Sequence, residues 1–237
     1  MSKVNKSEVN LFALYKELFS FYNANKGTIK KYYRDLTKKY LAYNDPNIGR
    51  AFLRKPQYEA LEMYVFLKEF LDNEHMYKIF EDWYNEQNKF ELKKNNSNYV
   101  FEDRNNIQIS FGSMLAEKEY KSLFNILKKN SSQYANYIFA LTMGTGKTIL
   151  MATCIFYEFI LANKFPKDKR YCHNALVFAP DKTVLEALRE IQTFDKRLVV
   201  PPEYANILES HIKFHFLDES GGTLNTIDKS KFNIIIS

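Results

Sequence analysis

The residues best suited to chemistry lie in one short stretch, Ala140–Thr148, where two glycines precede a lysine and a threonine. Gly144 and Gly146 allow a tight turn in which successive backbone N–H groups face a common centre. Lys147 can reach the outer oxygens of a phosphate chain, and the Thr148 hydroxyl can coordinate Mg2+. The spacing therefore predicts a loop that binds phosphate groups.

Such a loop needs a strand before it and a helix after it, because the helix N-terminus adds N–H groups and its positive end to the anion site. The apolar run Tyr137–Leu141 predicts the strand, and residues 147–163 are apolar nearly all round, which predicts a buried helix. The alternative is a chance Gly-Lys-Thr sequence on a loop without function. The two flanking segments favour phosphate binding.

The wider chain must position this loop. From Tyr137 onward, short apolar runs alternate with helical patterns, which is typical of a parallel α/β sheet. The continuous run Ala175–Ala179 predicts a central strand covered on both faces, and Ile212–Leu217 and Phe232–Ile236 predict further strands. Before residue 130, apolar and aromatic residues recur at helical spacing. We therefore predict an α/β fold, with an all-helical N-terminal region over 1–130 and a parallel-sheet domain over 131–237.

The loop also resembles that of a known family. Against the pattern G-x-x-x-x-G-K-[ST], Gly146, Lys147 and Thr148 are in place, but Leu141 stands where the first glycine belongs. Superfamily 2 helicases and translocases relax that glycine, and the motor subunits of type I and type III restriction enzymes carry M-A-T-G-T-G-K-T. The loop is similar to this version and matches it over Gly144–Thr148. The resemblance implies a RecA-like P-loop domain that binds ATP and Mg2+.

In that family the loop would hold ATP, and Lys147 and Thr148 would take part in hydrolysis, with Thr148 on Mg2+. The implied loop residues are Thr142, Met143, Gly144, Thr145, Gly146, Lys147 and Thr148. The implied partners are DNA and a protein such as a methyltransferase-type subunit of a restriction system. Two alternatives stay open: a nucleotide-gated regulator whose helical region binds a protein partner, and an assembly module beside a disabled P-loop domain.

A second stretch, Ala175–Leu185, resembles motif Ia of superfamily 2, in which a strand ends in Ala-Pro and the next helix meets a nucleic-acid phosphate. The implied contact residues are Pro180, Asp181, Lys182 and Thr183. Unsatisfied N–H groups at a helix start, together with the charge of Lys182, suit such a contact. The alternative is an ordinary turn with Asp181 as the helix N-cap.

A third stretch, Phe52–Gln57, is similar to the Leu-Arg-x-x-Gln segment that precedes the P-loop strand in this superfamily, whose glutamine reads the adenine edge. An amide can pair with the donor and the acceptor of adenine together. Gln57 lies 90 positions before Lys147, so a helical insertion would have to loop out between them. The alternative is a surface glutamine on the first turn of a helix.

Asp218 and Glu219 imitate the Asp-Glu pair of a Walker B strand, which would bind Mg2+ and polarise the attacking water. Lys213 and His215 alternate with apolar residues, however, which indicates a half-exposed strand. We therefore expect the true pair to lie beyond Ser237. On this interpretation the chain is the N-terminal part of a motor, its P-loop domain is incomplete at the C-terminus, and it does not turn over ATP alone.

Charge, cysteine count and hydropathy limit the classes of protein to which the chain can belong. The formal net charge of +6 permits a polyanionic partner such as DNA, but it also serves solubility alone. Cys154 and Cys172 are too few for a disulfide framework or a four-cysteine zinc site. No uncharged apolar run approaches the roughly 20 residues of a membrane span, and the first residues lack a signal-peptide core. We expect a cytoplasmic protein that does not enter a membrane.

Overall fold

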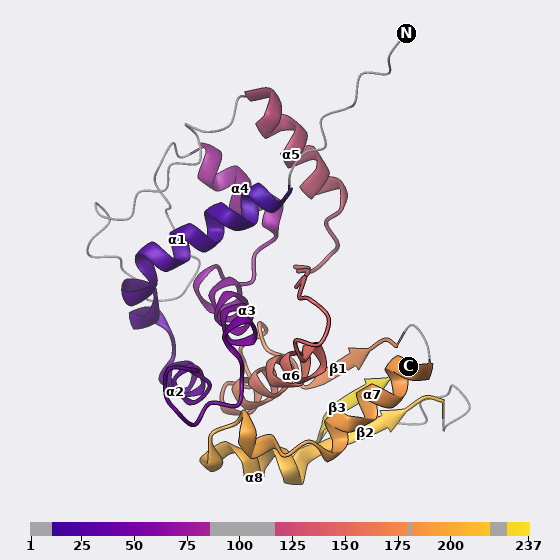
Figure 1. Ribbon diagram of the computed structural model, residues 1–237. Coiled ribbons are helices and arrows are strands. Elements are labelled where there is room, and N and C mark those ends of the chain that lie inside the picture. Colours follow the sequence, from indigo (N-terminus) through magenta and orange to yellow (C-terminus); the bar gives the residue numbers. More distant parts are fainter. Residues whose placement is uncertain (1–10, 86–116, 180–181, 219–226) are drawn as a thin grey trace. The chain divides into compact units, whose positions relative to one another are not determined.

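The computed structural model describes residues 11–85, 117–179, 182–218 and 227–237, and the chain forms two compact units. Unit 1 comprises Met1–Tyr33 and Phe66–Ile138, and unit 2 comprises Arg34–Val65 and Phe139–Ser237. The fold is mixed α/β and mostly helical, with a helical N-terminal region followed by a small parallel sheet (Figure 1). The expected fold class is confirmed at this level. Residues 34–65 group with the segment that carries the Ala140–Thr148 loop, whereas the sequence pattern divides the chain at residue 130.

Unit 1 is an aromatic-rich helical unit. Its described elements are α1 (Leu11–Tyr32), the π-helix η1 (Phe66–Phe70), α4 (Met76–Asn85) and α5 (Glu117–Lys129). In its core, the ring of Phe66 lies 5.2 Å from that of Tyr22 and 5.5 Å from that of Phe70, centroid to centroid. The aromatic residues that recur at helical spacing in α1 and η1 therefore serve packing.

Unit 2 is built around a sheet of three parallel strands in the order β1-β3-β2. Its elements are α2 (Asp35–Tyr43), α3 (Lys55–Val65), α6 (Lys147–Lys164), β1 (Asn174–Val177), α7 (Lys182–Thr193), the 3₁₀-helix η2 (Lys196–Leu198), α8 (Pro202–His211), β2 (Ile212–Phe216) and β3 (Phe232–Ile236). All residues of β3 are buried, and β3 has a strand on each side. The ring of Phe159 stacks on that of Phe232 at 5.0 Å, so α6 packs directly on the sheet.

The predicted strand before the loop does not form. Tyr137–Leu141 has no strand assignment, and the side chain of Ile138 is 96% exposed. Phe139 instead packs edge-on against Tyr64, with ring centroids 6.2 Å apart. An apolar run becomes a strand only where a neighbouring strand supplies hydrogen-bond partners, and no strand of the described residues pairs with this one.

The prediction that Ala175–Ala179 forms the central strand is also wrong. The strand there is β1, which pairs only with β3 and lies at an edge of the described sheet. Leu176 is 55% exposed and Phe178 is 73% exposed. A continuous apolar run does not by itself distinguish an edge from a centre, and the later strand β3 takes the central place.

Candidate phosphate-binding loop

The backbone of the loop turns twice through the left-handed region. Gly144 and Gly146 have φ angles of +73° and +74°. Residues with a Cβ adopt this region only at a cost, so both positions favour glycine. The Thr145 hydroxyl donates a hydrogen bond to the carbonyl of Thr142 at 2.7 Å and closes the turn. The chain then enters α6 at Lys147.

The start of α6 is suited to an anion. Gly146 is the N-cap residue, and it provides no side-chain cap. The first N–H groups of a helix have no carbonyl partner within it, and the positive end of the helix dipole lies at the same place. Lys147 is exposed and Thr148 is half-buried. The arrangement can therefore hold phosphate oxygens through backbone N–H groups and an ammonium, with the Thr148 hydroxyl as a candidate ligand for Mg2+.

The outer part of the loop faces solvent. Thr142, Met143 and Gly144 are exposed, and Met143 is 93% exposed. A small ligand can therefore approach the loop from solvent without displacing part of the core of unit 2.

Gln57 lies directly beside the loop, although 89 positions separate it from Gly146. Its Nε2 donates to the carbonyl of Gly146 at 3.0 Å, and its Oε1 accepts from the backbone N–H of Arg54 at 2.8 Å. Arg54 precedes the first residue of α3, so this second bond is the reciprocal half of a capping box. Gln57 is only 3% exposed, so it is not the surface glutamine of the alternative interpretation.

A buried glutamate joins α3 to α6. The Tyr64 hydroxyl donates to Glu158 Oε1 at 2.6 Å, and the backbone N–H of Cys172 donates to Glu158 Oε2 at 3.3 Å. Burial raises the pKa of Tyr64 well above its ordinary value, and the Glu158 carboxylate raises it further. The two helices lie side by side, because Gln57 meets the start of α6 and Tyr64 meets Glu158 in its second half. Sequence reasoning missed this pair, although a lone glutamate in a nearly all-apolar helix was an available signal.

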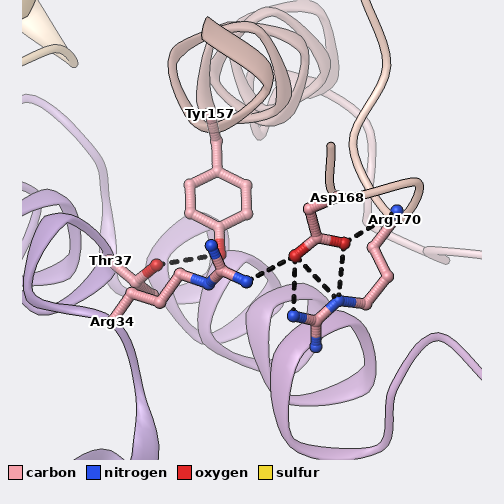
Figure 2. A network of polar contacts seen from close by, with 5 residues as sticks. All are labelled: Arg34, Thr37, Tyr157, Asp168 and Arg170. Carbon is pink, nitrogen blue, oxygen red and sulfur yellow. Dashed lines mark hydrogen bonds and ion pairs between the residues drawn. The ribbon is translucent and has the colours of Figure 1, made fainter. Parts of the chain in front are cut away.

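A second polar network ties α2 to the turn after α6. Figure 2 shows the Asp168 carboxylate between the guanidinium groups of Arg34 and Arg170. The side chains of Asp168 and Arg170 are only 15% and 19% exposed, whereas Pro166, Lys167 and Lys169 in the same turn are exposed. The Arg34 guanidinium also lies 3.9 Å from the Phe165 ring centroid. Burial alone would raise the pKa of Asp168, but the Arg170 hydrogen bonds and the two positive charges outweigh it and lower this pKa.

The lowered pKa predicts a pH-dependent stability. Asp168 binds its proton less tightly in the folded chain, so its contribution is complete above the unfolded pKa of about 4 and is lost as the pH falls through the folded value. We expect Asp168→Asn to lower the free energy of unfolding by about 2 kcal/mol at pH 7. Urea unfolding of the unaltered chain and of the variant should show the difference between their free energies of unfolding shrinking below about pH 4. The exposed Asp35 supplies a control, Asp35→Asn, and an equal effect there would refute the role of the network.

The remaining predicted site residues lie at the start of α7, after β2, or outside the described residues. Pro180, Asp181 and Glu219 are outside them, and Lys182 and Thr183 are the first two residues of α7, whose side chains are not described. Asp218 is exposed, follows the edge strand β2, and pairs with Arg189 at 2.7 Å. The mixed burial of β2 agrees with the half-exposed pattern in its sequence.

The thiols and the described acidic groups give no other reactive centre. Neither cysteine forms a disulfide, and burial, aided by Glu158, raises the pKa of Cys154 to about 12, so its thiolate is not available near neutral pH. Within the described ranges, no three His, Cys, Asp or Glu side chains are placed to hold a metal ion. None of the described helices combines the length and the apolar composition that a membrane crossing requires.

Comparisons with protein-family models, with curated proteins and with solved structures found no significant match to this chain. The features that bear on function are therefore the loop, its surroundings in unit 2, and the sequence resemblance of the motifs.

Proposed function

We propose that residues 142–148 bind the phosphate groups of ATP with Mg2+, and that the chain is the ATP-binding part of a DNA helicase or translocase of superfamily 2. The observation that carries the proposal is the loop itself. Gly144 and Gly146 turn through positive φ directly before an uncapped helix whose first residues are Lys147 and Thr148. Phosphate groups suit such a site because helix N–H groups, the helix dipole and the lysine all attract negative charge.

The finer fold proposed for unit 2 is a RecA-like domain. Support comes from the parallel sheet and from helix α6, which leads from the loop back to β1. The strand that such a domain places before the loop does not form at Tyr137–Leu141, so this support is partial. The motor assignment depends on the resemblance of Leu141–Thr148 and Ala175–Leu185 to superfamily 2, and a net charge of +6 suits a polyanionic partner. Lys147 and Thr148 would hold the triphosphate and Mg2+, and hydrolysis would require carboxylates supplied from elsewhere.

Nucleotide binding tests the proposal first. Calorimetric titration of the full chain with ATP and Mg2+ should give measurable binding, and Lys147→Ala should weaken it by about tenfold to a hundredfold, because a charge-assisted hydrogen bond to phosphate is lost. Lys164→Ala is the matched control, since Lys164 is exposed at the opposite end of the same helix. Absence of binding in the unaltered chain, or equal effects of the two substitutions, would contradict the proposal.

DNA binding tests the motor assignment separately. The ATP-binding part of a motor should bind single- or double-stranded DNA with little sequence preference and with an affinity that falls steeply as salt rises. Fluorescence anisotropy with labelled oligonucleotides at two salt concentrations measures both properties. Nucleotide binding without any DNA binding would favour the nucleotide-gated regulator instead.

A further inference from the structure

We propose that Gln57 is a positioning residue that holds the phosphate-binding loop through the carbonyl of Gly146, and that it does not read the nucleotide base. The inference rests on the proposed function, because it concerns how the same loop is prepared for phosphate. It differs from the role that the family resemblance implies for this glutamine.

The amide of Gln57 is already committed to the protein. A backbone N–H must face an oxygen and a backbone carbonyl must face a donor, so the partners Arg54 and Gly146 determine which end of the amide is oxygen. Reading adenine would require the same oxygen and nitrogen to face the base together. With both atoms on backbone groups and the side chain 3% exposed, the amide presents no free edge to a base.

Gln57 acts on the peptide that starts the helix. The carbonyl of Gly146 accepts from Gln57 Nε2 at 3.0 Å and from the backbone N–H of Leu150 at 3.1 Å. In a trans peptide the carbonyl and the following N–H point in opposite directions. Holding the Gly146 carbonyl toward Gln57 and Leu150 therefore directs the N–H of Lys147 the other way, out of the helix start, where a phosphate oxygen would bind.

The contact between Gln57 and residue 146 is so close that it favours glycine at position 146. A Cβ on Gly146 would lie 2.6 Å from Gln57 Nε2, so the amide packs directly against this residue. Gln57 itself is carried on a fixed element, because the capping bond to Arg54 holds the start of α3 and the Tyr64–Glu158 hydrogen bond holds its end against α6. The loop is thus held before any ligand arrives, which reduces the ordering required on binding.

Binding of three ligands distinguishes positioning from base reading. Gln57→Met keeps the length of the side chain and removes both hydrogen bonds. We expect it to weaken the binding of ATP, GTP and tripolyphosphate, each with Mg2+, by one common factor of roughly fivefold to tenfold, since tripolyphosphate has no base. Loss of ATP affinity alone would show that Gln57 reads adenine and would overturn the inference, as would unchanged binding of all three.

A second variant separates the loop contact from the helix cap. Gln57→Glu keeps the oxygen that accepts from Arg54 but sets a carboxylate oxygen, which cannot donate, against the Gly146 carbonyl, so the cap is retained while the loop contact is lost. Its thermal midpoint should fall, because a buried oxygen then has no donor, and binding of all three ligands should weaken. If Gln57→Met does not fold, this variant carries the comparison, because its added negative charge acts on the phosphate chains of all three ligands: weakened binding of all three supports positioning, and loss of ATP affinity alone overturns it. Failure of the unaltered chain to bind any of the three ligands would instead refute the proposed function.

Discussion

Replacing Gly146 with alanine is expected to weaken the binding of ATP and Mg2+ by on the order of a hundredfold. The residue has a φ of +74°, and a left-handed conformation costs a residue with a Cβ about 1–2 kcal/mol. The new Cβ would also lie 2.6 Å from Gln57 Nε2, so the amide must move and its hydrogen bond, about 1 kcal/mol, is lost. Calorimetric titration measures the effect.

Gly144→Ala is the matched control for this substitution. Gly144 has nearly the same φ, +73°, but nothing lies within 4 Å of a Cβ built there. Only the cost of the left-handed backbone conformation applies to Gly144→Ala, so the affinity for ATP should fall by about tenfold. Equal losses in the two variants would mean that the Gln57 contact has no part in preparing the loop.

Glu158→Ala is expected to lower the free energy of unfolding by about 3 kcal/mol. The substitution leaves the Tyr64 hydroxyl buried without its acceptor, which costs about 1–3 kcal/mol, and opens a cavity in the core between α3 and α6. Equilibrium unfolding in urea, followed by circular dichroism, measures the loss.

Two further variants show whether the buried hydrogen bonds cause this loss. Glu158→Gln retains an acceptor of similar volume and should be destabilised much less. Glu190→Ala removes an exposed glutamate from α7 and should change the stability by less than about 0.5 kcal/mol. A loss in Glu158→Gln as large as that in Glu158→Ala would show that the hydrogen bond from Tyr64 is not the source.

The parts of the site that could be predicted from the sequence are those with local signals. Two glycines before Lys147 predict a turn, and the apolar residues after it predict α6, which the structure has over Lys147–Lys164. These features depend on residues within a few positions of one another. Gln57 is different: nothing local connects it to the loop, and only the resemblance of Phe52–Gln57 to a family segment directed attention to it.

The parts that were missed depend on partners far apart in the chain. Tyr64 and Glu158 are 94 positions apart, and Arg34 and Asp168 are 134 positions apart, so spacing carries no information about either pair. The strand expected at Tyr137–Leu141 failed for the same reason, since a strand is defined by its neighbour as much as by its own residues. Composition alone could not place β3, rather than β1, at the centre of the sheet.

Amide chemical shifts of the 15N-labelled chain, titrated with ATP and Mg2+, test most directly whether the loop binds phosphate. We predict that the backbone N–H signals of Gly144–Thr148 move furthest, with Lys147 among them, because these groups would donate to phosphate oxygens. Tripolyphosphate with Mg2+ should move the same signals. Binding that shifts signals elsewhere and leaves Gly144–Thr148 unchanged, or no shift at millimolar ligand, would contradict the account.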